Sequence, residues 1–129
     1  MKNLRNFTAH SISFYHRDDV NYVSSIRKHV VKDGSIPYLT IPSEGMLSIA
    51  YENDPVEDEE FPVPLYRKLV LRLDRIPEMG ENDVLVVSVA YATYRKQTDT
   101  SMGIPLYTVN DTVYDKEGKV IGCLGLIVN

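Results

Sequence analysis

The sequence has little cysteine and no long apolar run. Its one cysteine, Cys123, stands within the apolar residues 120–128 and has no second cysteine for an intrachain disulfide. This setting favours a buried thiol over a catalytic one, because no histidine lies near it in sequence to act as a base. No apolar run approaches the ~20 residues that cross a bilayer, and the first fifteen residues hold no signal-peptide pattern. We therefore expect a cytoplasmic protein without membrane contact.

The sequence also lacks the short motifs of common catalytic and metal sites. It contains no phosphate-binding loop, no G-x-G-x-x-G or G-x-S-x-G pattern, and no zinc-ligand pair. Its three histidines are not spaced as ligands on one element, and the six acids in residues 52–60 lack the glycine and the spacing of a calcium loop. We therefore expect no catalytic residue, no metal and no cofactor, and a binding protein more than an enzyme.

Strong positive charge is absent as well. The 129 residues carry a net charge of -4, which argues against binding of duplex nucleic acid, since that needs many lysines and arginines at the phosphates. One small anionic ligand held by a few basic groups is compatible with this charge. Apolar residues make up 43% and charged residues 25%, which is typical of a folded protein, and the length fits one domain over residues 1–129.

Residues 83–97 predict a buried strand followed by a helix. Asp83 to Val87 is a short run rich in β-branched residues, which is typical of a strand covered on both faces. Ser88 follows as a helix-capping residue, and after it the apolar positions change to helical spacing. Together with alternating runs elsewhere, this stretch predicts an α+β fold: a mostly antiparallel sheet with one short helix near residues 88–97.

Two segments near the amino terminus predict further strands. Residues 6–15 alternate between apolar and polar side chains and predict a half-buried first strand. Residues 21–32 fit either a helix or a strand pair. The strand pair is favoured because Asp33-Gly34 is a strong turn signal between extended runs.

Three later features predict loops and irregular strands. The acidic residues 52–60 predict a solvated surface loop, because like charges repel one another. Asn110-Asp111 predicts a turn, followed by a closing hairpin around residues 115–118. In the last strand, Gly122 and Gly125 indicate a bulge or a close backbone approach.

Nine tyrosines stand in a chain that has no tryptophan. Tyr91, Tyr94 and Arg95 fall at positions i, i+3 and i+4, so the predicted helix carries them on one face. Tyrosine stacks on bases and arginine pairs with phosphate, so this face and the strand residue Arg67 suit a nucleotide-like ligand. The alternative interpretation, which is the more common role of a tyrosine, is that these side chains pack in the sheet.

Hydroxyl groups extend the candidate ligand site. Thr98, Thr100 and Ser101 lie in the polar loop after the helix, and such loops often carry binding groups. Ser43 opens the turn Ser43-Glu-Gly45, whose amides could hold an anion, although an ordinary hairpin turn explains the same residues. His10 is either a ligand-site residue or general base, or a residue at a strand start that bonds to nearby backbone.

Short stretches in a fixed order resemble a family of small phage and prophage proteins. The first is Asn6-Phe-Thr-Ala-His10, where the family has Asn-Leu-Thr-Pro-His before an alternating strand. The resemblance continues over most of the chain, in residues 41–45, 61–66, 87–92, 103–105 and 115–122. This sequence departs from the family pattern in Ala9, in the added Glu44 and residues 17–36, and in Ser48, which stands where an arginine is common.

This family is similar to the phage proteins that counter Thoeris immunity, which bind a cyclic ADP-ribose signal and sequester it without cleaving it. The resemblance therefore implies an anti-defence sponge in the host cytoplasm. It implies a small nucleotide-derived signal as the ligand, stacked by Tyr91 or Tyr94 and paired by Arg95, and a homo-oligomer that encloses it. Two alternatives stay open: a phage accessory protein that binds and inhibits a host protein through the acidic loop and a sheet edge, and a hydrolase of such signals.

Overall fold

The computed structural model describes the whole chain, residues 1–129. Its elements are β1 (Asn3–Asn6), β2 (Ile12–Phe14), the 3-10 helix η1 (Arg17–Asp19), β3 (Val20–Val23), β4 (Lys28–Val31), β5 (Leu39–Ile41), β6 (Ile49–Val56), β7 (Leu65–Leu73), β8 (Asp83–Val86), α1 (Val89–Gln97), β9 (Leu106–Tyr114) and β10 (Val120–Val128). Many strands with one α-helix agree with the predicted α+β class. None of the helices is both long enough and apolar enough to pass through a bilayer.

Eight strands form the main sheet, which runs in the order β1-β8-β9-β10-β2-β5, with β4 also paired to β9 and β3 to β4. Counted by paired residues, the sheet is mostly antiparallel, as predicted, and its longest antiparallel pairing is the β9–β10 hairpin. Parallel pairs join β1 to β8, β8 to β9, β4 to β9 and β10 to β2. These pairs connect segments that are distant in sequence, so local patterns did not predict them.

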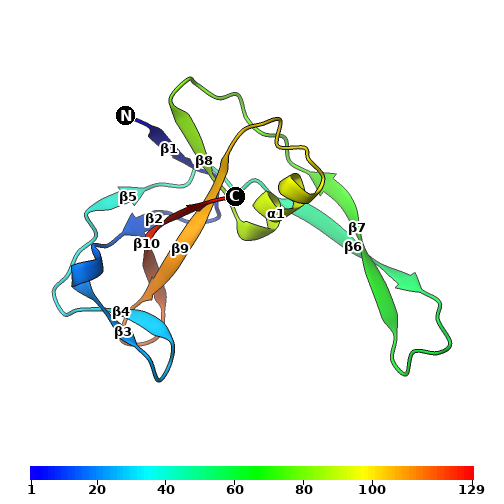
Figure 1. Cartoon of the computed structure of the whole chain (residues 1–129), viewed down its shortest axis with the longest axis horizontal. Helices are drawn as coiled ribbons and strands as arrows, with labels where there is room; N and C mark the ends of the chain where they lie inside the picture. The colour runs from blue at the N-terminus through cyan, green and yellow to red at the C-terminus, as the bar shows by residue number, and fades with distance from the viewer.

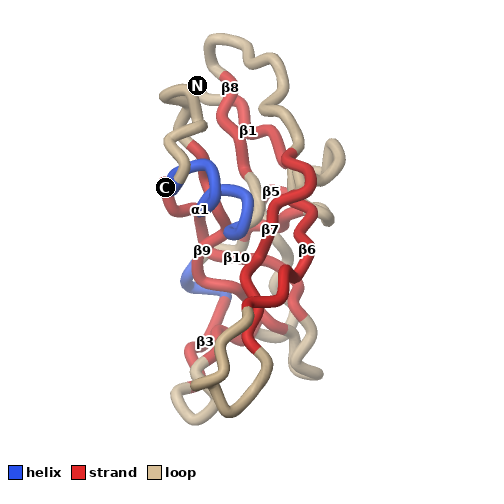
Figure 2. The backbone as a smooth tube through the Cα atoms, turned by 90° about the vertical axis from the view of Figure 1, so that its right-hand side faces the viewer, coloured by secondary structure: helices blue, strands red, loops and turns tan.

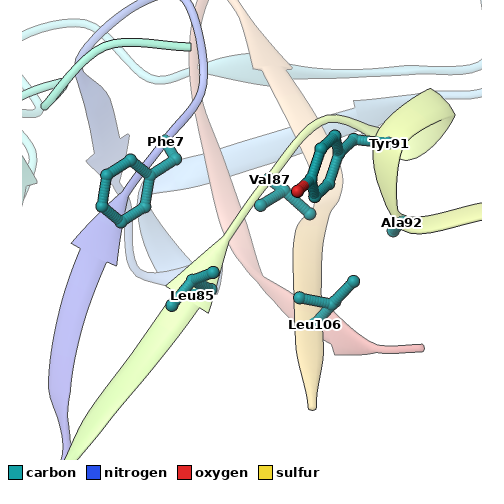
Figure 3. Packing of buried hydrophobic residues seen from close by; sticks show 6 residues of the cluster. All are labelled: Phe7, Leu85, Val87, Tyr91, Ala92 and Leu106. Carbon is teal, nitrogen blue, oxygen red and sulfur yellow. The ribbon is translucent and has the colours of Figure 1, made fainter. Parts of the chain in front are cut away.

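β8 is a buried strand of the main sheet, and α1 packs on it. Val84, Leu85 and Val86 are buried, and β8 has β1 on one side and β9 on the other. Ser88 caps α1, because its hydroxyl oxygen accepts a hydrogen bond of 3.3 Å from the Tyr91 amide. Both predicted elements are thus confirmed. Figure 3 shows the buried residues of this core: Phe7, Leu85, Val87, Tyr91, Ala92 and Leu106.

β6 and β7 form a separate two-stranded sheet, here called the arm (residues 49–73), that projects from the main sheet (Figure 1). In the view turned by 90°, its two strands face the reader (Figure 2). At the start and end of the arm, Ile49 and Leu73 pack against the core around Tyr91. No residue of the arm is buried, although both strands carry large apolar side chains.

The predicted first strand over residues 6–15 is wrong in its middle. β1 ends at Asn6, β2 begins at Ile12, and residues 7–11 form a connecting loop. The buried side chain of Asn6 is hydrogen-bonded to this loop and so holds the backbone away from an extended course. His10 therefore lies in a loop and not at an alternating strand position.

Two segments predicted as loop or turn belong to strands. Residues 52–56 of the acidic stretch lie in β6, where they pair with β7, and residues 57–60 form part of the connecting loop. Asn110 and Asp111 lie within β9, where Asp111 has a φ of 54°. Aspartate tolerates this left-handed conformation, and β10 stays paired with β9 on both sides of it.

The strand pair predicted in residues 21–32 is confirmed. β3 and β4 pair in antiparallel register, with their turn at residues 24–27. Asp33-Gly34 turns the chain after β4, so the turn signal marks the exit from this hairpin and not its tip.

Candidate functional site

The predicted ligand face of α1 is turned into the protein. Tyr91 has no exposed surface, and its hydroxyl donates a hydrogen bond of 2.7 Å to the Asp74 carbonyl oxygen. Arg95 is 9% exposed, and its guanidinium donates to the same oxygen at 2.9 Å and to the Thr100 carbonyl oxygen at 3.2 Å. Tyr94 is half-buried. Tyr91 and Arg95 thus tie the helix to the end of the arm.

The polar loop after α1 folds back onto the helix. The Thr98 hydroxyl lies 2.7 Å from the Tyr94 carbonyl oxygen and 2.7 Å from the Thr100 hydroxyl. The Thr100 amide donates to the Arg95 carbonyl oxygen at 2.9 Å, and Ser101 is half-buried. The structure therefore brings these predicted residues together, and it bonds most of their polar groups to one another.

The other two predicted site residues lie elsewhere. Arg67 is on the arm, where its guanidinium is 3.7 Å from the Asp54 carboxylate. Ser43 lies beside the loop of residues 7–11, and its hydroxyl donates a hydrogen bond of 2.6 Å to the Thr8 carbonyl oxygen. The next two amides of the predicted anion-binding turn also bond within the chain. The eight predicted residues thus form no single site, and their contact with a ligand stays a prediction.

A cleft of about 610 Å³ opens beside the loop of residues 7–11. Its walls come from this loop, the start of β2, β9 and the start of β10, and six of its eleven lining residues are apolar. The volume lies within the range of about 300–1,000 Å³ that is typical of small-molecule sites. None of the eight predicted site residues lines it. This cleft is the candidate functional site.

Asn6 holds one wall of the cleft in place. Its side-chain nitrogen donates hydrogen bonds of 2.8 and 3.0 Å to the carbonyl oxygens of His10 and Ile41. Its side-chain oxygen accepts hydrogen bonds of 2.9 and 2.6 Å from the amide and hydroxyl of Thr8. Both hydrogens and both lone pairs of the buried Asn6 side-chain amide therefore have hydrogen-bond partners. The loop that carries His10 is thereby held against β5.

Charged groups fix the strand that leads into this loop. The Arg5 guanidinium in β1 lies 3.0 Å from the Glu44 carboxylate and 3.5 Å from that of Asp83. The hydrogen bond to Glu44 raises the pKa of Arg5. The hydrogen bond from Asn3, followed by that from the Gly80 amide, lowers the pKa of Asp83. These contacts connect β1 to β8 and to the turn at Glu44, so the loop starts from an anchored strand.

β10 supplies another wall of the cleft. A Cβ on Gly122 would stand 2.5 Å from the Ser13 carbonyl oxygen, so the predicted close approach is confirmed there, whereas Gly125 has no such neighbour within 4 Å. The predicted buried thiol is confirmed in Cys123, which has no exposed surface. Burial raises the pKa of the Cys123 thiol to about 11. The thiol is therefore protonated at neutral pH and is a poor nucleophile.

The groups that line the cleft suit a small ligand with both charge and apolar surface. Lys119 is exposed in its lining and forms no ion pair within the chain, so its ammonium is free to pair with an anion. His10 and Ser11 are exposed and offer hydrogen-bonding groups. Ile12 and Val120 add apolar surface.

Sequence reasoning reached only part of this site. A ligand-site role was one of two interpretations of His10, and no sequence pattern indicated that Lys119 belongs to a site. The sequence feature that marks this site is Asn6-Phe-Thr-Ala-His10. The buried side chain of Asn6 is hydrogen-bonded to Thr8 and His10 of the loop. No protein-family model, no curated protein and no solved structure matches the chain. The phage-family resemblance therefore stays a prediction.

Proposed function

We propose that this protein binds a small nucleotide-derived signal in the cleft beside residues 7–11 and sequesters it without cleaving it. The observation that carries the proposal is a cleft of about 610 Å³ whose loop wall is already ordered and whose lining includes a free cation, Lys119. The resemblance of the sequence supplies the ligand class, a cyclic ADP-ribose isomer. In this proposal the protein is a phage anti-defence protein that acts in the host cytoplasm as a homo-oligomer.

Each part of the lining has a use for such a ligand. Lys119 pairs with a phosphate group as a point charge. His10 and Ser11 exchange hydrogen bonds with ribose hydroxyls. Ile12 and Val120 remove one face of the base from water. Because the Asn6 side chain already holds the loop, binding needs little ordering of this wall, and that favours affinity.

The cleft is preferred to the face of α1 because the polar groups of Tyr91 and Arg95 are bonded within the protein. A ligand at that face would have to replace these hydrogen bonds, which makes binding less favourable. Sequestration needs affinity and no nucleophile, and the protonated Cys123 thiol agrees with that requirement.

Thermal unfolding with a panel of cyclic ADP-ribose isomers tests the proposal. At a hundredfold excess over Kd, we expect one isomer to raise the melting temperature by roughly 5–10 °C. Lys119→Glu should remove most of this shift, because it places a negative charge beside the ligand phosphate. Lys32→Glu makes the same charge change at an exposed position outside the cleft and should leave the shift in place. Mass spectrometry of the ligand released by heating should show it intact.

Three results would count against the proposal. A melting temperature that no cyclic nucleotide changes would contradict ligand binding itself. A shift lost in Tyr94→Ala but kept in Lys119→Glu would move the site to α1. Turnover of the ligand by substoichiometric protein would make the protein a hydrolase.

A further inference from the structure

We propose that the arm is a self-association surface, on which the arms of two copies of this chain pack face to face in opposite directions about a two-fold axis. The inference identifies the contact surface of the proposed homo-oligomer. It rests on that part of the proposed function and does not depend on the ligand. The observations that carry it are the exposed area of the chain, the uncovered faces of the arm and the distribution of charge along it.

The chain exposes more surface than a compact monomer of its size. Its accessible surface is 9015 Å² for a mass of 14.7 kDa. The scaling for compact monomers gives about 6,900 Å² at this mass, so the chain exposes about 2,100 Å² more. A standard protein–protein interface removes about 800 Å² from each partner. The excess exposed area is therefore larger than the area that each copy would contribute to a stable interface.

Much of the exposed apolar surface lies on the arm, on both of its faces. Leu69 of β7 is 48% exposed and Tyr66 is 56% exposed, and they point to opposite faces because they stand three positions apart, an odd offset in a strand. Leu71 is 61% exposed, and Tyr51 of β6 is 38% exposed. An isolated two-stranded hairpin is only marginally stable in water. The arm therefore needs a surface that covers at least one of these faces.

The faces of the arm, and not its edges, suit the contact. Both strands have a free edge, since β6 pairs only with β7. Pro55 has no amide hydrogen to donate along the edge of β6, and the register of the arm shifts between Ala50 and Tyr51. Both features oppose the addition of another strand. Packing of the leucine face of one arm on that of the other uses Leu69 and Leu71 and needs no free backbone groups.

The charges of the arm select a second copy in the opposite direction. Residues 57–60 near the tip, here called the acidic tip, are four exposed acids without an ion pair in the chain. Arg72 and Arg75 are exposed at the base; the Arg72 guanidinium lies 3.5 Å from the Asp74 carboxylate, whereas Arg75 forms no ion pair in the chain. β7 has nine residues and spans about 30 Å. Two antiparallel arms bring each acidic tip to the other arm's basic end, whereas parallel arms would place the tips together.

A charge-exchange experiment on the full chain tests this arrangement by sedimentation equilibrium without ligand. The wild-type chain should form a dimer. A tip variant, in which Glu57, Asp58, Glu59 and Glu60 are all changed to lysine, should have two positive ends and dimerise at least about tenfold more weakly. A base variant, Arg72→Glu with Arg75→Glu, has two negative ends and should weaken similarly. An equimolar mixture of the two variants should form a heterodimer, because each end then meets the opposite charge.

The mixture also shows that both variants are folded, since an unfolded arm would not recover affinity. A charge control, Glu117→Lys in the turn between β9 and β10, should leave dimerisation unchanged. In the apolar contact, Leu71→Asp should weaken the dimer, while Ile26→Asp, at an exposed position of 54%, should not. A wild-type chain that stays monomeric would overturn the inference, and the partner of the arm would then be a different protein. Variants that dimerise as wild type, or a mixture without heterodimer, would also overturn it.

Discussion

β8 and the arm are two apolar stretches of one chain that meet different surroundings. Three of the four residues of β8 are buried, because β1 and β9 flank the strand and Tyr91 and Ala92 of α1 pack on it. On the arm, Leu69 and Leu71 are 48% and 61% exposed. The apolar side chains of the two regions thus differ in what lies opposite them.

This difference separates two sources of stability. The cover of β8 comes from the same chain, so its contribution to the free energy of unfolding does not depend on concentration. In the proposed dimer, the cover of the arm comes from another copy, so its contribution grows with protein concentration. Substitutions at matched leucines in the two regions should show the contrast directly.

The largest expected effect on the free energy of unfolding is at the buried strand β8. Leu85→Ala should lower the free energy of unfolding by about 2–5 kcal/mol, because it leaves a cavity where the side chain was fully buried. Leu71→Ala on the arm should change it by less than about 0.5 kcal/mol in dilute protein, because that side chain is exposed. Urea denaturation measures both. Equal losses would show that the arm is covered within the monomer and would break the comparison.

The next effect is at the junction of the two regions. Arg95→Met keeps the apolar stem but removes the hydrogen bonds to Asp74 and Thr100, and should cost about 1.5–3 kcal/mol. Lys96→Met, at the exposed neighbouring position, should cost less than about 0.5 kcal/mol. Thermal unfolding compares the two variants. A stable Arg95→Met that fails to bind ligand would instead assign Arg95 to the ligand site.

A smaller effect is expected where two strands of the main sheet approach closely. Gly122→Ala should destabilise by about 1–3 kcal/mol, because the added Cβ meets the Ser13 carbonyl oxygen and the Tyr15 ring. Gly125→Ala should be neutral or stabilising by up to about 1 kcal/mol, because its surroundings are open. Urea denaturation of the two variants shows how tightly the main sheet is packed at Gly122. Similar losses at both glycines would show that the close contact at Gly122 does not decide the outcome.

The smallest effect concerns acid pH. Hydrogen bonds from the Ser48 amide and hydroxyl lower the pKa of Asp74 below its ordinary value of 3.8, with the Arg72 charge as a lesser cause. The native state then binds fewer protons than the unfolded state, so this stabilisation is present above pH 3.8 and is lost as pH falls through the native pKa. Asp74→Asn should flatten the decline in stability at acid pH. An unchanged pH profile would show that this contact between Ser48 and Asp74 at the base of the arm contributes nothing to stability.

Most strands and the helix were predictable because their signals are local. Ser88 and the spacing after it predict α1, and the run of β-branched residues before it predicts β8. The break between β1 and β2 was not predictable, because the side chain of Asn6 bonds to Ile41 in another strand. The cleft was missed for a similar reason: Lys119 and His10 line one cavity only because β2 and β10 are neighbours in the sheet.

The order of strand, cap and helix in residues 83–97 follows from the sequence by itself, since a capping hydroxyl and helical spacing act within a few residues. The direction of its side chains was decided by the tertiary structure. Tyr91 and Arg95 share a helical face that suits a ligand as well as a core. In the structure this face points inward, where both side chains donate hydrogen bonds to the Asp74 carbonyl oxygen. The exposure of the arm was decided in the same way. Burial depends on which distant segments come to lie opposite an apolar face, and apart from the contacts of Ile49 and Leu73 with the core, no segment of this chain covers β6 and β7.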